Sequence, residues 1–127
     1  MAERIPIIKF RDFLLVSIQV EVHDRLVLNL QSDLAEAISS TGVHGVLIDI
    51  SSVEIVDSFV GRMLANVAAV GQLLGAETVV VGIQPAIAIT LVELGLTLDG
   101  VHTALDTESG MEMLSHLTKN NHDHSEN

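Results

Sequence analysis

The chain has no cysteine, tryptophan or tyrosine, and three phenylalanines, Phe10, Phe13 and Phe59, are its only aromatic residues. The absence of cysteine excludes disulfides, thiol catalysis, iron–sulfur clusters and cysteine-ligated zinc. Positive charge is also scarce, because 6 Lys and Arg stand against 17 Asp and Glu, which gives a formal net charge of −11. Nucleic acids and anionic membrane surfaces are bound through basic and aromatic side chains. Neither is therefore expected as a partner.

The chain also lacks the segments that direct a protein into or across a membrane. No basic stretch leads into an apolar run near Met1, and no apolar stretch reaches the roughly 18 residues that a bilayer span requires. We therefore expect a cytoplasmic protein, in agreement with the absence of cysteine. With 127 residues, 48% of them hydrophobic, the chain can bury a core of its own. We predict a single domain over residues 1–118 and a polar, disordered tail over residues 119–127.

Hydrophobic periodicity predicts an α/β fold with the element order ββαβαβαβα, in which helices flank a mixed, mostly parallel sheet. The predicted strands cover residues 5–10, 13–19, 46–50, 78–83 and 101–105, and the predicted helices cover residues 24–40, 57–74, 85–94 and 106–117. The first two strands form an antiparallel hairpin around Arg11 and Asp12, whereas crossover helices make the other strands parallel. The second helix is expected to point an apolar stripe inward, at Val60, Met63, Leu64, Val67, Ala68, Gly71 and Leu74. In the last helix, Asp106 is the expected N-cap.

The strand over residues 46–50 is apolar on both faces, which predicts a place in the centre of the sheet. Ligands gather at the carboxyl ends of parallel strands, so the segment Ser51–Arg62 is the candidate site. Asp49, at the end of this strand, could be the phosphate-accepting carboxylate of a receiver domain. Such a site needs a lysine that neutralises the phosphoryl group, and the only lysines, Lys9 and Lys119, do not follow a central strand. The receiver interpretation therefore lacks its cation.

Other catalytic and metal sites lack essential parts. Ser58 does not lie in the G-x-S-x-G pattern of a serine hydrolase, and the sequence alone brings no histidine to it. The patterns G-x-x-x-x-G-K and G-x-G-x-x-G, which bind nucleotide phosphates, are absent. His122 and His124 offer at most a weak metal site, because a preorganised third ligand is missing. We therefore predict no catalytic residue, no cofactor and no metal.

Asp57 and Ser58, at the expected start of the second helix, admit two interpretations. Either side chain can cap the helix by accepting a hydrogen bond from a backbone N–H group, which is their more common use and stabilises a helix by about 1 kcal/mol. Alternatively, a phosphate on Ser58 would bring about −1.5 to −2 charges to amide groups that can accept them. Arg62, one turn further on, could pair with Asp57 or with that phosphate. An exposed ion pair of this kind contributes only about 0.3–0.5 kcal/mol.

The sequence Val56-Asp57-Ser58-Phe59-Val60-Gly61-Arg62, together with the element order and the apolar strand, resembles the STAS domain family of anti-sigma-factor antagonists. The resemblance covers residues 4–117. Members of this family carry a phosphorylatable serine or threonine after an aspartate at the start of the second helix. The order Asp57-Ser58-Phe59, followed by Arg62 on a short chain, is most similar to the RsbS-type scaffold group of the stressosome.

This resemblance implies partner switching as the mechanism. Ser58 would accept phosphate from an RsbT-type kinase, and Asp57, Phe59 and Arg62 would shape the switch. The unphosphorylated chain would form homodimers and larger assemblies with RsbR-type paralogues and hold the kinase, whereas phosphorylation would release the kinase and a phosphatase would reset the serine. The high aliphatic content agrees with assembly, since contacts between subunits bury apolar surface. The alternative is a simple anti-sigma-factor antagonist that binds a sigma-sequestering kinase directly.

Overall fold

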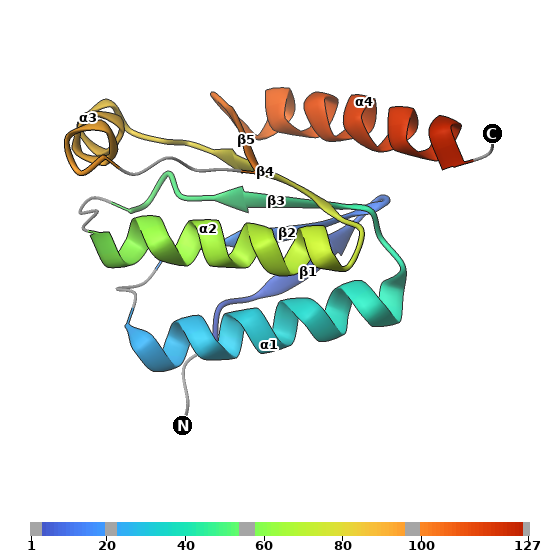
Figure 1. The fold of residues 1–127 in the computed structure, drawn as a ribbon, viewed down its shortest axis with the longest axis horizontal. Helices are drawn as coiled ribbons and strands as arrows, with labels where there is room; N and C mark the ends of the chain where they lie inside the picture. The colour runs from blue at the N-terminus through green and yellow to red at the C-terminus, as the bar shows by residue number, and fades with distance from the viewer. Residues whose placement is uncertain (1–3, 20–22, 54–57, 96–99, 126–127) are drawn as a thin grey trace.

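A five-stranded sheet runs through the centre of the molecule (Figure 1). The computed structural model describes residues 4–19, 23–53, 58–95 and 100–125. The strands are β1 (Ile7–Phe10), β2 (Phe13–Ser17), β3 (Gly45–Asp49), β4 (Glu77–Val81) and β5 (Val101–Ala104), and the helices are α1 (Asp24–Thr41), α2 (Ser58–Leu73), α3 (Pro85–Glu93) and α4 (Thr107–Ser125). The strand order is β1-β2-β3-β4-β5, with β1 antiparallel to β2 and the other pairs parallel. The predicted α/β fold and its element order are confirmed.

Helices cover both faces of the sheet, as the crossover connections between parallel strands require. α1 and α2 lie on one face, and α4 lies on the other (Figure 1). α1 connects β2 to β3, α2 connects β3 to β4, and α3 connects β4 to β5. Because β2 to β5 are parallel, their carboxyl ends lie at one edge of the sheet, where α2 and α3 begin. We call this edge the carboxyl edge.

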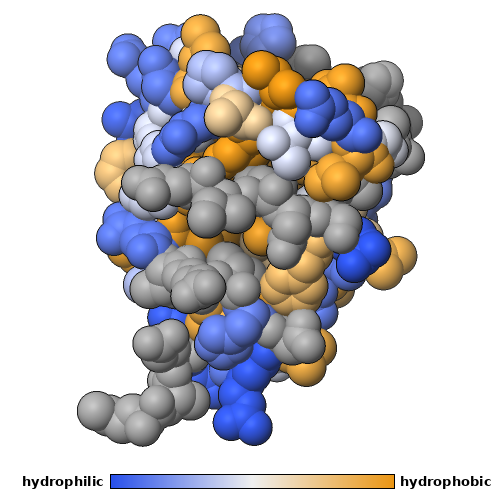
Figure 2. Space-filling model, turned by 90° about the vertical axis from the view of Figure 1, so that its left-hand side faces the viewer, coloured by the Kyte–Doolittle hydropathy of each residue, from blue (hydrophilic) through white to orange (hydrophobic). Residues whose placement is uncertain are grey.

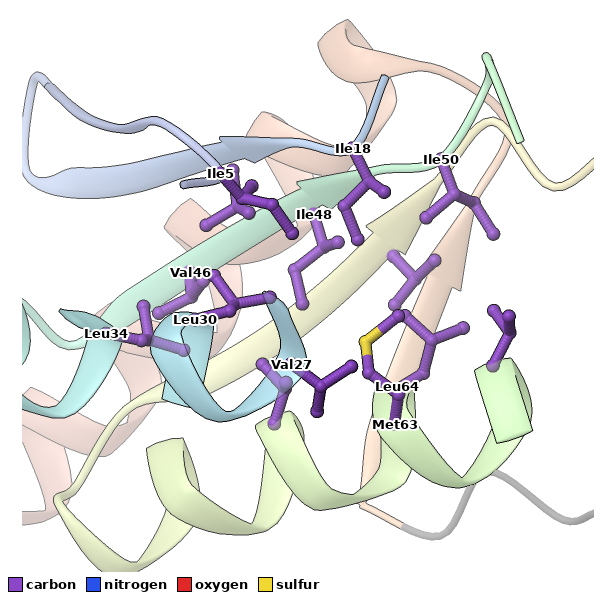
Figure 3. Close-up of a cluster of buried hydrophobic side chains, with 14 of the residues drawn as sticks. Ile5, Ile18, Val27, Leu30, Leu34, Val46, Ile48, Ile50, Met63 and Leu64 are labelled. Carbon is purple, nitrogen blue, oxygen red and sulfur yellow. The ribbon is translucent and has the colours of Figure 1, made fainter. Parts of the chain in front are cut away.

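Two apolar clusters hold these layers together. In the larger one, between the sheet and the helices α1 and α2, Ile48, Leu30 and Leu64 are fully buried (Figure 3). Burial of a leucine or isoleucine side chain stabilises the folded state by about 1.5–3 kcal/mol. The smaller cluster, on the other face, packs Leu114 of α4 against Leu47 of β3. The packing therefore fixes both layers of helices on the sheet.

The amphipathic helix predicted over residues 24–40 is confirmed as α1, which ends one residue later. Its N-cap is His23, whose Nδ1 accepts a hydrogen bond from the N–H of Leu26 at 3.4 Å. At the other end, Gly42 has a φ of 70° and donates its N–H to the carbonyl of Ile38 at 2.9 Å. Glycine adopts this left-handed conformation without the steric cost that a side chain would add. Both ends of α1 are thus set by capping residues.

Two leucines lie elsewhere than the sequence analysis predicted. Leu74, expected on the inward stripe of the second helix, is 42% exposed. Its N–H donates to the carbonyl of Gly71 at 3.0 Å, and this tighter turn rotates the side chain off the helical stripe. Leu105, expected at the end of the last strand, is 90% exposed because β5 ends at Ala104.

The last helix is longer than its apolar pattern suggested. We expected it to end at residue 117, with a disordered segment from residue 119, but α4 continues to Ser125. Its middle is held on the sheet by the fully buried Leu114. Once a helix is started in this way, each added residue gains a hydrogen bond, so polar residues can extend it.

Candidate regulatory site at the carboxyl edge

The loop after β3 is held by neighbouring segments of the carboxyl edge. The carboxylate of Asp49 accepts a hydrogen bond from the N–H of Ser51 at 2.8 Å. The side-chain amide of Gln84, which follows β4, donates to the carbonyl of Ser51 at 2.9 Å. Gly82 lies so close that a Cβ there would come within 2.9 Å of the Ser51 nitrogen. Asp49, considered above as a phosphate acceptor, therefore shapes the turn from which the chain leads to Ser58.

Ser58 is the first residue of α2. Two residues of the following turn, Val60 and Met63, are buried in the larger apolar cluster, and Phe59 packs against the same cluster. These contacts fix the backbone of Ser58 at the carboxyl edge, at the end of the helix whose macrodipole favours negative charge. Asp57 lies outside the described residues, so its predicted role as a cap or as a neighbour of the switch stays a prediction.

Arg62 lies one helical turn beyond Ser58 and is exposed. In the described part of the chain, its guanidinium group forms no ion pair. Residues four positions apart lie on the same side of a helix. Arg62 is therefore the basic side chain that the helix offers to a negative charge on Ser58.

A second carboxylate occupies this edge after β5. Asp106 accepts a hydrogen bond from the N–H of Ser109 at 2.8 Å, which confirms its predicted role as the cap of the last helix. This backbone hydrogen bond, together with one from the Ser109 side chain, lowers the pKa of Asp106 below its usual value of 3.8. Asp106 therefore carries a negative charge at neutral pH, as an addition to that of Asp49.

An exposed apolar surface, which the sequence analysis did not identify, lies beside these polar loops. Ile89 and Val92 of α3 are 59% and 78% exposed. In Figure 2, hydrophobic side chains gather in the upper part of this end of the molecule, where Figure 1 shows α3. The signal in the sequence is that residues 85–93 are apolar around most of the helix rather than on one side. Exposed apolar side chains that gather on one surface are typical of sites that contact another protein.

Three histidines have structural partners. The Nδ1 of His23 caps α1, His102 Nε2 lies 3.2 Å from a carboxylate oxygen of Glu77, and His44 Nδ1 lies 3.4 Å from the carbonyl oxygen of Gly75. Among the residues that the structure describes, no three His, Asp or Glu side chains are grouped to hold a metal ion. Within those same ranges, no helix combines the length and the apolar character of a membrane span.

Comparison with known proteins places this arrangement in a family. Residues 4–109 match the STAS domain. A chain in a solved structure of the stressosome, described as a signal integration and transduction hub, is 42% identical, with a TM-score of 0.78 and coverage of 89% of this chain and 98% of that one. The S58E variant of RsbS from Moorella thermoacetica is 40% identical, with a TM-score of 0.77 and coverage of 91% and 97%.

One curated relative is similar to this chain over only part of its own, longer chain. The RsbT co-antagonist protein RsbRD of Bacillus subtilis (strain 168) is 35% identical over 83 residues, which are 65% of this chain but only 30% of RsbRD. The residues that match the family contain all five strands and the first three helices. On this agreement of sequence and fold, the chain belongs to the STAS domain family.

Proposed function

We propose that this chain is a non-catalytic, cytoplasmic scaffold of a stressosome-type complex, and that phosphorylation of Ser58 controls which partners it holds. Residues 1–118 form the STAS domain, which assembles as homodimers and with RsbR-type paralogues. The unphosphorylated domain sequesters an RsbT-type kinase. Phosphate transfer from that kinase to Ser58 releases the kinase, and a phosphatase restores the serine. The similarity to RsbS and RsbRD over most of the domain supports this proposal.

The observation that carries the proposal is the position of Ser58 at the start of a rigidly packed helix on the carboxyl edge. A helix N-terminus accommodates a phosphate, because its macrodipole and its backbone N–H groups favour negative charge. Phosphorylation of Ser58 can therefore leave the fold intact. The Moorella RsbS variant S58E places an acidic side chain at a position with the same number, in a protein that is covered over 97% of its length.

The surroundings of Ser58 explain why a phosphate there would change binding. Asp49 and Asp106 already make the edge acidic, whereas Arg62 is the basic residue within one turn. Nearby, Ile89 and Val92 offer an apolar surface on which a partner can dock. A phosphate at the border of such a contact must be desolvated and repels acidic groups of the partner, which weakens the complex.

Mapping the phosphorylated residue tests the proposal. After incubation with the cognate RsbT-type kinase and ATP, we expect mass spectrometry to find one phosphate per chain, on Ser58. Ser58→Ala is expected to abolish incorporation, and Ser52→Ala is the matched control because Ser52 is an exposed serine of the same edge. Incorporation that persists in the Ser58→Ala variant, or that is lost in the control, would contradict the proposal.

The size of the assembly separates a scaffold from a simple anti-sigma-factor antagonist. Mixed with an RsbR-type paralogue, a scaffold is expected to form a large particle that retains the kinase in light scattering and sedimentation. A complex no larger than a heterodimer with a sigma-binding kinase would instead favour the antagonist, even if Ser58 were the phosphorylated residue.

A further inference from the structure

A hollow of about 500 Å³ lies at the end of the sheet opposite to Ser58. Its walls come from the turn between β1 and β2, the C-terminal end of α1 and the second half of α4, which meet at the right-hand end of the molecule in Figure 1. We call it the amino-end hollow, because β3 begins beside it. Both lysines of the chain, Lys9 and Lys119, line it.

The two lysines have no counterion among the side chains that the structure places. In a chain with a net charge of −11, each could have paired with a carboxylate, yet neither forms an ion pair with the side chains that the structure places, which in α4 end at residue 119. Among the described lining residues, Asp12 is the only acidic one. Two ammonium groups at one concavity repel each other and attract an anion, and one carboxylate offsets only part of that attraction.

The polar groups of the lining indicate how an anion would be held. Thr41 and Thr118 donate their hydroxyl protons to carbonyls of their own helices, at 2.6 and 2.8 Å, so they have no proton left for a ligand. The hydroxyl of Ser115 has no partner among the described residues and can donate. His44 directs Nδ1 to a backbone carbonyl at 3.4 Å, which leaves Nε2 for another contact. Because a neutral imidazole that donates from Nδ1 has only an acceptor at Nε2, the donors of the lining are the two ammonium groups and the hydroxyl of Ser115.

From this geometry we propose that the amino-end hollow binds a small phosphate compound. Lys9 and Lys119 neutralise the phosphate charge, and lysine ammonium groups are common phosphate ligands because each acts as a compact point charge with several donors. The hydroxyl of Ser115 completes the set of donors. The volume lies within the range of small-molecule sites, so the organic part of a phosphate ester also fits. This site goes beyond the proposed function and does not involve Ser58.

Titration with pyrophosphate, followed by amide chemical shifts of the full chain, tests the proposal. We expect saturable shifts at or below about 10 mM pyrophosphate, confined to the segments that line the hollow. Lys9→Gln and Lys119→Gln should each weaken binding about fivefold, as the loss of one Coulomb contact near water predicts. Arg25→Gln is the matched control, because Arg25 is an exposed base on α1 that does not line the hollow. It should leave the affinity unchanged.

A variant that is expected to bind pyrophosphate more tightly complements these losses, because partial unfolding cannot raise the affinity. Asp12→Asn removes the single described carboxylate of the lining and should tighten pyrophosphate binding about two- to fivefold. Binding that does not saturate, or that falls equally in Arg25→Gln, would overturn the site. Equal affinity for citrate, a polycarboxylate of similar charge, would overturn its assignment to phosphate. The titrations with pyrophosphate and with citrate need no kinase. A negative result for the hollow therefore leaves the proposed Ser58 switch untouched.

Discussion

The two ends of the sheet carry opposite kinds of surface. At the carboxyl edge, Asp49 ends β3, Asp106 follows β5, and the exposed Ile89 and Val92 lie on α3. At the other end, Lys9 and Lys119 line the amino-end hollow. The sheet therefore places both lysines of the chain at the end opposite to the serine that we propose to be phosphorylated.

This separation has a consequence for the switch. A lysine beside Ser58 would neutralise part of its phosphate and reduce the effect on a partner. With both lysines at the other end, Arg62 is the base that can screen the phosphate within one turn of α2.

Backbone packing at the two ends can be compared with a matched pair of substitutions. Gly82 has a φ of 78°, and a Cβ there would lie 2.8 Å from the Cβ of Ser51. We expect Gly82→Ala to lower the free energy of unfolding by about 2–5 kcal/mol, because left-handed strain and overpacking add. Gly42, at the other end, has a φ of 70° but nothing within 4 Å, so Gly42→Ala should cost only the strain, about 1–2 kcal/mol.

Urea denaturation of both variants measures this difference. Equal losses of stability would contradict the tight contact between the loops after β3 and β4. Kinase binding by Gly82→Ala should also fall at temperatures where the variant is folded, because the chain that leads to Ser58 starts at Ser51. Gly42→Ala should bind the kinase like the wild type.

The sequence predicts a feature of the fold when the residues that form it are close together in the chain, and it misses features formed by residues far apart in the chain. Helix ends were predictable where a local signal exists, as with Gly42 after α1 and Asp106 before α4. Leu74 was misplaced because a tight turn of the backbone, and not the apolar spacing, ends α2. The bond between Gln84 and Ser51 joins segments that only the order of the strands brings together, so no local pattern announces it.

Near the start of β4, a residue that lines neither the amino-end hollow nor the candidate site offers a substitution that should stabilise the fold. Thr78 of β4 is 1% exposed, and its hydroxyl has no hydrogen-bond partner among the described residues. A buried hydroxyl without a partner costs free energy that a methyl group does not. Thr78→Val is therefore expected to raise the free energy of unfolding by about 1 kcal/mol in urea denaturation, and a loss of stability would show that the hydroxyl is satisfied.

The smallest effect on the stability of the fold is expected from the charge of Asp106. Its pKa is lowered in the folded state by the hydrogen bonds from Ser109, so its charge stabilises the fold above the unfolded pKa. This contribution is lost as the pH falls through the folded pKa. Asp106→Asn should therefore lower the melting temperature slightly at pH 7, and this difference should disappear at an acid pH where the carboxyl group is protonated in both the folded and the unfolded state. An equal decrease at both pH values would mean that packing, and not charge, is responsible.

The candidate site was only partly predictable for the same reason. The order Asp57-Ser58 and the base Arg62 are local patterns, and they directed attention to the start of α2. The two lysines of the amino-end hollow are far apart in sequence and come together only because α4 returns along the sheet to the β1–β2 turn. The sequence shows that no lysine follows a central strand. It does not show that Lys9 and Lys119 line the same hollow.

Co-sedimentation of the RsbT-type kinase with the assembled chain tests the central claim most directly. Ser58→Asp places a negative charge at the start of α2, and Ser52→Asp places the same charge on an exposed position of the same edge. We predict that Ser58→Asp retains about tenfold less kinase than the wild type, while Ser52→Asp retains nearly as much as the wild type. Undiminished retention of the kinase by Ser58→Asp, in a folded assembly, would contradict the switch.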